Sequence, residues 1–162
     1  MSDDLAVLSR VLAEPGQPLA MFRAFEAATA RLVGHELFTL LHVDGDEVAR
    51  VHSSRPAEYP LAGRKRMGPT PWGEHVLKGR KSFLGRDKAA IRWAFFDHAL
   101  IESMGLGATI NVPVLYDGAA IGTINLLAPE HFYREEHVAP VERLAPLLVP
   151  AFLLARAQAR AN

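Results

Sequence analysis

Two Asp-Gly dipeptides, at 44–45 and 117–118, restrict the fold of this chain more than any other feature of its sequence. Each dipeptide lies between two stretches that are rich in apolar residues, many of them alternating with a period of two. Asp-Gly readily adopts the left-handed backbone of a tight hairpin turn, and the flanking stretches are typical of β-strands. The sequence therefore predicts two β-hairpins, over 36–53 and 109–127, and with them an antiparallel sheet.

Apolar residues at helical spacing surround these hairpins. In chain order, the other expected elements are a helix capped by Asp3 or Asp4 and reaching Leu12, a helix over 18–34, a surface loop over 55–71, a short helix over 72–77, a short strand over 82–84, a helix over 91–104 and a long helix from 138. Pro146 and Pro150 should bend the last helix, because each removes an intrahelical hydrogen bond. This order predicts an α+β domain whose antiparallel sheet is covered by helices.

The 162 residues are 49% apolar, which is enough for one compact domain over 1–162. The formal net charge is zero, but nine basic residues and only two acidic ones fall within 64–92. This basic segment has three interpretations: a solvated face, a binding site for nucleic acid, or a segment in which one or two arginines hold a ligand carboxylate or phosphate. The arginines considered for that role are Arg64, Arg66, Arg86 and Arg92. Nucleic-acid binding would need exposed aromatic residues, and both Trp72 and Trp93 are expected to be buried, so this partner is not expected.

The absence of cysteine excludes disulfides, thiolate metal sites and thiol nucleophiles. The seven histidines are scattered, with no helical i, i+4 pair, so neither a metal site nor a cofactor is expected. His42 and His52 fall on adjacent strands of the first hairpin and would be the only pair placed to meet. The chain starts with an acidic Met-Ser-Asp-Asp sequence, and no apolar run approaches the roughly 20 residues that span a bilayer. We expect a cytoplasmic protein without a membrane partner.

A family resemblance rests on the second hairpin. The sequence is Gly-Leu-Gly-Ala-Thr-Ile-Asn-Val-Pro-Val at 105–114, then Asp-Gly at 117–118, then Ile-Gly-Thr-Ile-Asn-Leu at 121–126. This pattern resembles the central signature of GAF domains. The surrounding order of helix, hairpin, variable loop with short helices, hairpin and closing helix is similar too, so the resemblance covers about 19–157.

The resemblance implies a PAS-related six-stranded antiparallel sheet with the terminal helices on one face. Short helices and loops, over about 59–104, would cover a small-molecule pocket on the other face. Such domains commonly dimerise through their terminal helices, and several apolar residues on more than one side of the closing helix agree with a dimer. Members that reduce methionine sulfoxide, or that attach a bilin covalently, do so through cysteine, and this chain has none.

The segment 92–102 holds three aromatic residues, two acids and an imidazole. On one continuous helix, Glu102 would lie beside His98 and orient its ring. Together with Asp97 and Trp93, His98 could form a polar anchor in an aromatic-lined pocket. The alternative is that Trp93 belongs to the core and His98 and Glu102 form a solvated pair.

Two asparagines lie inside the strands of the second hairpin, where asparagine is disfavoured. Asn111 would lie opposite Ile124 across a regular two-residue turn, and opposite Asn125 if one residue were bulged. The two amides either line the pocket or brace the loops. Trp72 also has two interpretations. It is either a core residue positioned by a Thr70 cap or a pocket wall that stacks on a planar ligand.

These inferences predict a stand-alone GAF-like sensor or regulatory domain that is dimeric and binds a small polar or anionic, planar metabolite. The candidate ligand-binding residues are Arg64, Trp72, Trp93, Asp97, His98, Asn111 and Asn125. No nucleophile motif or phosphate-binding loop is present, so catalysis is not expected. Two alternatives stay open: an enzyme that uses His98 with Asp97 or Glu102 as a general base, and an interaction module with a filled core.

Overall fold

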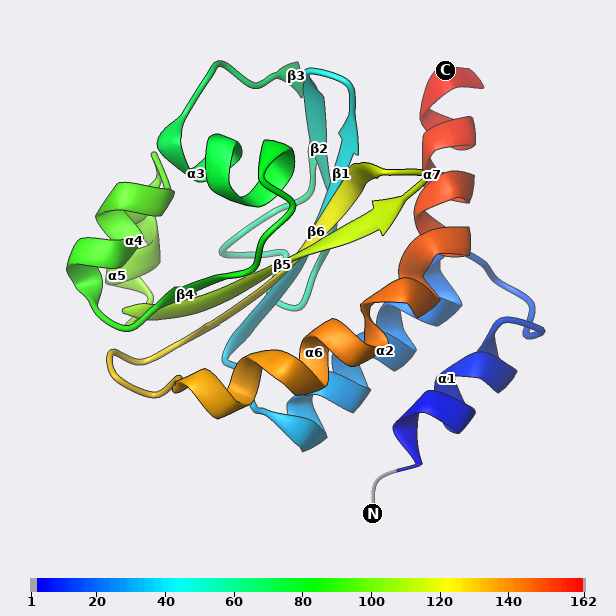
Figure 1. The fold of residues 1–162 in the computed structure, drawn as a ribbon, viewed down its shortest axis with the longest axis horizontal. Coiled ribbons are helices and arrows are strands. Elements are labelled where there is room, and N and C mark those ends of the chain that lie inside the picture. Colours follow the sequence, from blue (N-terminus) through cyan, green and yellow to red (C-terminus); the bar gives the residue numbers. More distant parts are fainter. Residues whose placement is uncertain (1–2, 162) are drawn as a thin grey trace.

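The two expected hairpins form the centre of a six-stranded antiparallel sheet in a computed structural model, which describes residues 3–161 (Figure 1). In spatial order the strands are β3 (Ala62–Arg66), β2 (Glu47–Ser53), β1 (Leu37–Asp44), β6 (Ala119–Ala128), β5 (Ala108–Tyr116) and β4 (Phe83–Gly85). The hairpins join where β1 pairs with β6, so strands far apart in sequence become central neighbours. The predicted α+β class and six-stranded antiparallel sheet are confirmed.

The helices form a layer on each face of the sheet (Figure 1). One layer contains α1 (Asp4–Val11), α2 (Leu19–Leu32), the 3₁₀ turn η2 (Glu135–His137), α6 (Val138–Leu144), the 3₁₀ segment η3 (Ala145–Leu148) and α7 (Val149–Ala161). The other contains α3 (Pro71–Gly73), the π-helical turn η1 (Glu74–Lys78), α4 (Lys88–Ala94) and α5 (His98–Ser103). The terminal helices thus leave the opposite face of the sheet to the short elements, as expected.

The main core lies between the sheet and the terminal helices. Phe25 from α2, Phe38 from β1 and Phe152 from α7 are fully buried there. A smaller apolar cluster lies under α4 and α5, where Ile91 and Ile101 pack with Leu37 and Leu127 from the sheet. Successive residues of a strand point to opposite faces, so β1 supplies Phe38 to one cluster and Leu37 to the other.

The closing helical region, Glu135–Ala161, differs from expectation in one respect. It is 27 residues long, and its most apolar window has a mean hydropathy of 1.6, so by length and composition alone it could cross a membrane. Leu144, Leu148 and Phe152 are buried in the core, which accounts for much of this apolar character. Pro146 lies in η3, which separates α6 from α7, and the predicted bend is visible in Figure 1.

Three local predictions are wrong. The segment 55–71 contains β3, an edge strand whose glycine and three consecutive basic residues show no apolar alternation, so its pairing with β2 was missed. The helix expected over 91–104 is two helices, because Phe95 is extended (φ −124°, ψ 128°). The side chain of Asp3 does not cap α1, although Asp4 in the first turn binds Arg31 at 2.7 Å.

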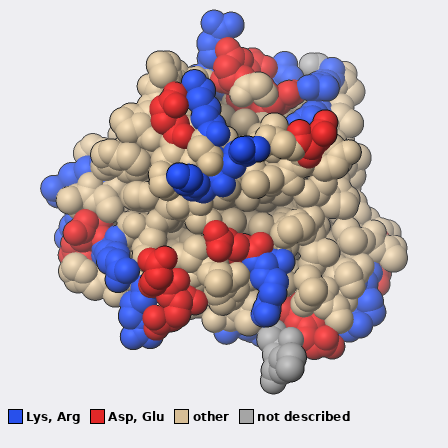
Figure 2. All heavy atoms as spheres, viewed as in Figure 1, with Lys and Arg blue, Asp and Glu red and all other residues tan. Residues whose placement is uncertain are grey.

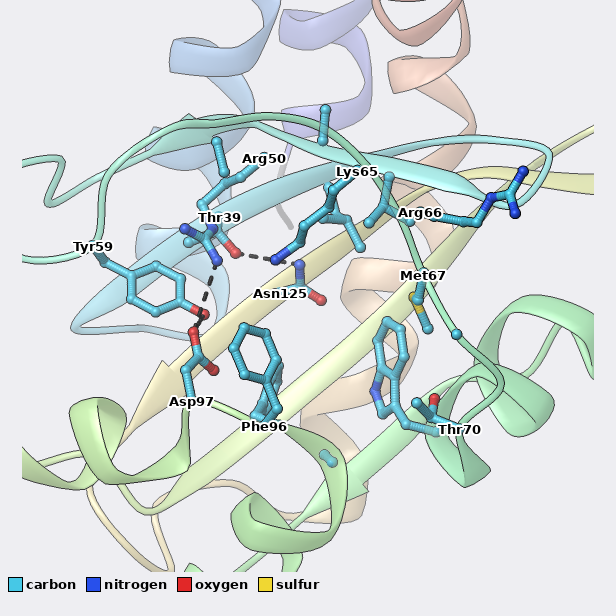
Figure 3. Close-up of a pocket in the computed structure, with 18 of the residues that line it drawn as sticks. Thr39, Arg50, Tyr59, Lys65, Arg66, Met67, Thr70, Phe96, Asp97 and Asn125 are labelled. Carbon is cyan, nitrogen blue, oxygen red and sulfur yellow. Dashed lines mark hydrogen bonds and ion pairs between the residues drawn. The ribbon is translucent and has the colours of Figure 1, made fainter.

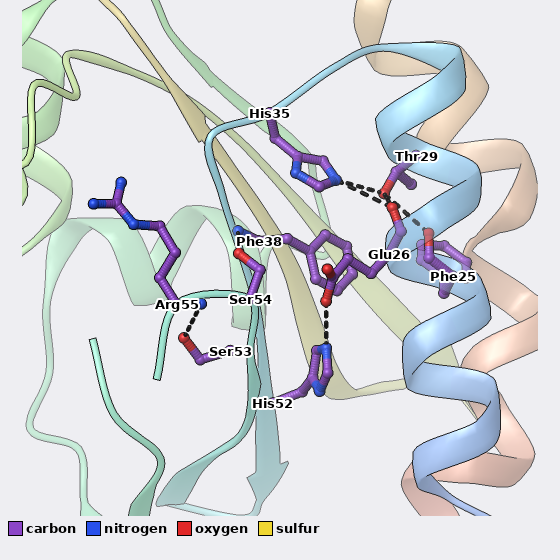
Figure 4. Close-up of polar contacts among 9 residues, drawn as sticks. All are labelled: Phe25, Glu26, Thr29, His35, Phe38, His52, Ser53, Ser54 and Arg55. Atoms are coloured by element: carbon purple, nitrogen blue, oxygen red, sulfur yellow. Dashed lines mark hydrogen bonds and ion pairs between the residues drawn. The ribbon is translucent and has the colours of Figure 1, made fainter. Parts of the chain in front are cut away.

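A polar cluster joins α2 to β2 on the sheet face that the terminal helices cover (Figure 4). The Nε2 atom of His52 lies 2.7 Å from the Glu26 carboxylate, and that of His35 lies 3.1 Å from the Thr29 hydroxyl. Burial lowers the pKa of His35. His52 is therefore engaged by α2 and does not meet His42, and no cluster of three potential metal ligands occurs within residues 3–161.

His42 is buried against α7, with its ring stacked on Phe152 at 6.3 Å. Its Nε2 atom is buried and has no hydrogen-bond partner in the part of the chain that the structure describes. Burial lowers the pKa of His42, and the nearby charges of Arg156 and Arg160 add to this while Asp44 opposes it. The folded protein thus favours the neutral imidazole.

This pKa shift predicts an acid-sensitive contribution to stability. The pKa of His42 is lower in the folded than in the unfolded state, where it is about 6.5. Above that pH the ring is neutral in both states and its titration does not affect stability. As the pH falls below it, the unfolded state binds the proton more readily and the fold is increasingly destabilised. His42→Phe should therefore make the free energy of unfolding fall less steeply between about pH 7 and pH 5. Urea denaturation at several pH values measures both slopes, and equal slopes would contradict the prediction.

Candidate functional site

A cavity of about 360 Å³ lies on the sheet face opposite the terminal helices (Figure 3). Its floor comes from the sheet, with Thr39 and Leu41 of β1 and Asn125 of β6. Its walls come from β3 and the segments before and after it, from α3, and from the linker between α4 and α5. Side chains that form these walls include Tyr59, Lys65, Met67, Thr70, Trp72, Phe95, Phe96 and Asp97.

A row of buried polar side chains crosses the floor of the cavity. Asn111 lies opposite Asn125, because the hairpin contains one irregularity between Val114 and Leu115. The Asn111 amide donates to Asn125 Oδ1 at 2.9 Å, and the Asn125 amide donates to the Thr39 hydroxyl at 3.2 Å. The bulged register considered from the sequence is confirmed. The row keeps these polar groups satisfied beneath an otherwise apolar site.

Trp72 is held on this row by its indole nitrogen. Thr70 caps α3 by accepting a hydrogen bond from the Gly73 amide at 2.9 Å, which confirms the predicted cap. The buried Trp72 ring then donates from Nε1 to Asn111 Oδ1 at 3.1 Å and lies 6.4 Å from the Phe95 ring. Asn111 therefore braces the aromatic wall, whereas Asn125 itself lines the cavity.

Arg50, Tyr59 and Asp97 form a charged group at one end of the cavity (Figure 3). The Tyr59 hydroxyl donates to Asp97 Oδ2 at 2.7 Å, and Arg50 Nη2 lies 3.9 Å from the same oxygen. The Arg50 guanidinium also lies 3.8 Å from the centre of the Tyr59 ring and donates to the Pro60 carbonyl at 2.7 Å. Burial, followed by the charge of Asp97, raises the pKa of Tyr59, so the phenol remains a hydrogen-bond donor.

The cavity carries more positive than negative charge. Of the cations that line it, Arg50 lies 3.9 Å from Asp97 and Arg66 lies 3.4 Å from Asp46, so the excess is the charge of Lys65. Lys65 points from β3 into the space over Phe96, with its ammonium 4.8 Å from the centre of that ring (Figure 3). Phe96 is 83% exposed, so this contact lies at the mouth of the cavity.

The structure brings Trp72, Asp97 and Asn125 to the cavity, with Asn111 directly behind Trp72. Three other candidates lie outside its lining, namely Arg64, Trp93 and His98. Arg64 lies 3.7 Å from Glu47 on the edge of the sheet. Its neighbour Lys65 takes the place at the cavity, because adjacent strand residues point to opposite faces.

Trp93 is 46% exposed and packs on Phe83, with 5.0 Å between ring centres, so the expectation that both tryptophans are buried is wrong. Glu102 accepts from Arg92 at 2.9 Å and not from His98. The His98 Nδ1 atom is buried without a hydrogen-bond partner among residues 3–161. His98 and Glu102 both lie on α5, so their helical spacing is as expected, but Glu102 pairs with Arg92 of α4 instead.

Sequence reasoning did not single out Arg50, Tyr59, Lys65 or Met67. Arg50 offered one signal, since it is a charged residue in the middle of a strand whose neighbours are mostly apolar or small. Tyr59 and Met67 lie in a segment with no periodicity, and their positions depend on contacts with distant residues. Only the folded chain identifies them.

Comparison with known proteins places this architecture in a family. A family model described as the GAF domain matches residues 21–152. No curated protein sequence matches the chain significantly.

The fold is similar to that of the GAF domain of a phosphoenolpyruvate-protein phosphotransferase from Coxiella burnetii, at 18% identity over 96% of this chain and 94% of that one, with a TM-score of 0.75. The corresponding Acinetobacter domain has 12% identity over 97% of both chains and a TM-score of 0.73. The A. aeolicus nlh2 GAF domain in an inactive state has 14% identity over 94% of this chain and 95% of that one, with a TM-score of 0.70. With the family model covering most of its length and the same fold in these structures, the chain belongs to the GAF domain family.

Proposed function

We propose that this chain is a sensor or regulatory domain whose ligand is a small, anionic metabolite with a planar part, bound in the 360 Å³ cavity. GAF domains are generally small-molecule-binding sensor and regulatory domains. The observation that carries the proposal is the composition of the cavity, which combines aromatic walls with an excess of positive charge. Ligand sites typically combine mostly apolar walls with a few placed polar groups.

The cavity offers a different contact to each part of such a ligand. Trp72 and Phe95 provide flat apolar surface for a planar group. Arg50 and Lys65 are placed for an oxyanion, and a guanidinium can hold a carboxylate or phosphate through two parallel hydrogen bonds. Asn125 on the floor adds an amide for orientation.

Two chain segments are placed to respond to the ligand. The loop around β3 carries Lys65 and Met67, and the α4–α5 linker carries Phe96 and Asp97. Side chains of both segments would contact a bound ligand. The ligand would therefore shift the equilibrium of each segment toward the conformation that makes these contacts. In this proposal the signal is the altered order of these segments. An interaction module with a filled core is less well supported, because the site is hollow.

We further propose that two copies of the chain pair through their terminal helices in the cytoplasm. The layer of terminal helices exposes three leucines: Leu5 of α1 (49%), Leu19 of α2 (41%) and Leu154 of α7 (37%). The core takes most of the apolar residues of the closing helix, since Leu147, Val149 and Leu153 pack partly against it. Among the apolar residues of the closing helix, Leu154 is exposed and could contact a second copy of the chain.

Native mass spectrometry of the purified protein tests ligand and dimer together. We expect a dimer mass and a retained ligand that is lost in Leu41→Trp, because the larger side chain would fill the cavity from β1. Leu115→Trp is the matched control, since Leu115 is exposed and does not line this cavity.

Where the ligand is lost during purification, thermal shift with planar carboxylates and phosphates replaces the mass measurement. A compound that stabilises the wild type and the Leu115→Trp variant, but not Leu41→Trp, supports the site. Stabilisation that persists in Leu41→Trp would contradict the cavity assignment. A monomer at all protein concentrations would contradict the dimer.

A further inference from the structure

A second concavity, here called the basic groove, opens at the end of the sheet where the hairpins turn. It encloses about 1190 Å³ between the β1–β2 turn, the loop after β3, η1, the β5–β6 turn and α7. Figure 2 shows charged side chains surrounding the hollow over these elements. The residues 67–70 belong to the loop that lines both the groove and the cavity described above, so the two sites have a common wall.

The charges of the groove are unevenly compensated. Its basic residues are Arg66, Lys78, Arg80 and Arg156, and its acidic residues are Asp46 and Glu74. Each carboxylate is taken by one cation: Asp46 lies 3.4 Å from Arg66, and Glu74 lies 3.0 Å from Lys78. Arg80 and Arg156 form no ion pair within 4 Å among residues 3–161, although the charge of Arg156 acts on Asp44, which is bound by Arg160.

Arg156 is the more informative of the two. Its Nε atom is buried and has no hydrogen-bond partner within the described chain. One turn further along α7, Arg160 donates to both oxygens of Asp44, at 2.9 and 2.7 Å. Nearly all buried donors in folded proteins are satisfied, and an exception calls for an explanation such as a missing ion or ligand. Arg156 thus lacks the acceptor that its neighbour has.

Arg80 is held at the β5–β6 turn. Its backbone adopts a left-handed conformation (φ 55°), which is uncommon for a residue with a side chain. Its Nη1 atom donates to the Gly118 carbonyl at 3.1 Å, which fixes the guanidinium against the turn. A guanidinium has five donors, so this contact leaves others available toward the groove.

We propose that the basic groove is a second binding site, separate from the cavity, which holds the phosphate or carboxylate group of a small metabolite between Arg156 and Arg80. Both anions present paired oxygens that match the planar guanidinium. Val43, Val48 and Leu77 line the same groove and provide apolar surface for the rest of the metabolite. An anion in the groove would then balance the charge of Arg156.

The experiment is isothermal titration of the whole chain with pyrophosphate and with citrate at low ionic strength, where charge interactions are least screened. At least one of the two probes should bind saturably, and the tighter one identifies phosphate or carboxylate as the preferred group. Arg156→Gln and Arg80→Gln should each weaken binding by about tenfold, because each removes charge-assisted hydrogen bonds. Arg156→Lys keeps the charge but loses the paired donors of the guanidinium. Its affinity should lie between those of the wild type and Arg156→Gln.

Two control variants make the result specific. Arg143→Gln removes the same charge from an exposed position on α6 outside the groove, and should leave affinity within about twofold. Leu41→Trp fills the cavity and not the groove, so it should leave pyrophosphate and citrate binding unchanged. Failure of the cavity proposal therefore does not affect this one.

Three outcomes would overturn the proposal: no saturable binding of either anion, equal weakening by Arg143→Gln, or loss of binding in Leu41→Trp. Circular dichroism of each variant establishes that it is folded. Arg80 is exposed, so Arg80→Gln keeps the test decisive even if Arg156→Gln does not fold.

Discussion

Replacing Phe152 with alanine is expected to lower the free energy of unfolding by about 3–5 kcal/mol, among the largest losses for a single substitution in this chain. Phe152 is fully buried, and its ring lies 5.9 Å from that of Phe22 and 6.3 Å from that of His42. It therefore joins α7 to α2 and to the centre of the sheet. Alanine would leave a cavity at this junction, which the rigid strands could fill only in part.

The same ring explains a glycine in the middle of β6. A methyl group added at Gly122 would lie 2.6 Å from the nearest ring atom of Phe152. Gly122→Ala should therefore cost about 1–3 kcal/mol by overpacking, and less in a Phe152→Leu background, where the ring is absent. Gly63→Ala in β3 is the matched control, because nothing lies within 4 Å of its added carbon. Urea denaturation measures the four free energies of the cycle, and strictly additive costs would refute the steric explanation.

Asn111→Ala is expected to cost about 2–4 kcal/mol, although the substitution removes only a small polar side chain. The buried Asn111 amide accepts from Trp72 Nε1 and donates to Asn125 Oδ1. Alanine would leave the indole donor buried without its acceptor and would weaken the polar row under the cavity. We expect ligand affinity to fall as well, because Trp72 forms a cavity wall.

A smaller change in the same row provides the comparison. Thr123 donates to Asn125 Oδ1 at 3.2 Å, so Thr123→Val removes one contact at the end of the network and should cost only about 1 kcal/mol. Urea denaturation followed by tryptophan fluorescence measures both variants. If Asn111→Ala were no more costly than Thr123→Val, the bracing role of Asn111 would be wrong.

The central sheet could be predicted because its signals are local. Turn residues and alternating apolar residues specify a hairpin within about 20 residues of sequence, and both hairpins form, with Gly45-Asp46 as the turn of the first and Asp117-Gly118 as the turn of the second. Even the pairing of Asn111 with Asn125 could be expected once a single bulge was allowed. β3 was missed because an edge strand can form without apolar residues on either face. Glycine and charged residues make up most of this strand.

The candidate site was predictable only in part. Trp72, Asp97 and Asn125 belong to it, and each was noticeable as a residue type unusual for its place in the sequence. Arg50 and Tyr59 were missed because their role comes from contact with Asp97, which follows Tyr59 by 38 residues. Trp93, Asp97 and His98 were expected on one helix, and the extended backbone at Phe95 separates Trp93 on α4 from Asp97 and His98 at the start of α5.

The sequence by itself determined the two central hairpins and the family, because turn chemistry and hydrophobic period act between near neighbours. The tertiary structure decided which cations line the cavity, where the helix of 91–104 breaks, and that the Arg156 Nε atom has no acceptor among residues 3–161. These features depend on which distant groups are brought within a few ångströms. Hydrogen bonds and ion pairs act only at that range, so a single sequence does not contain them in readable form.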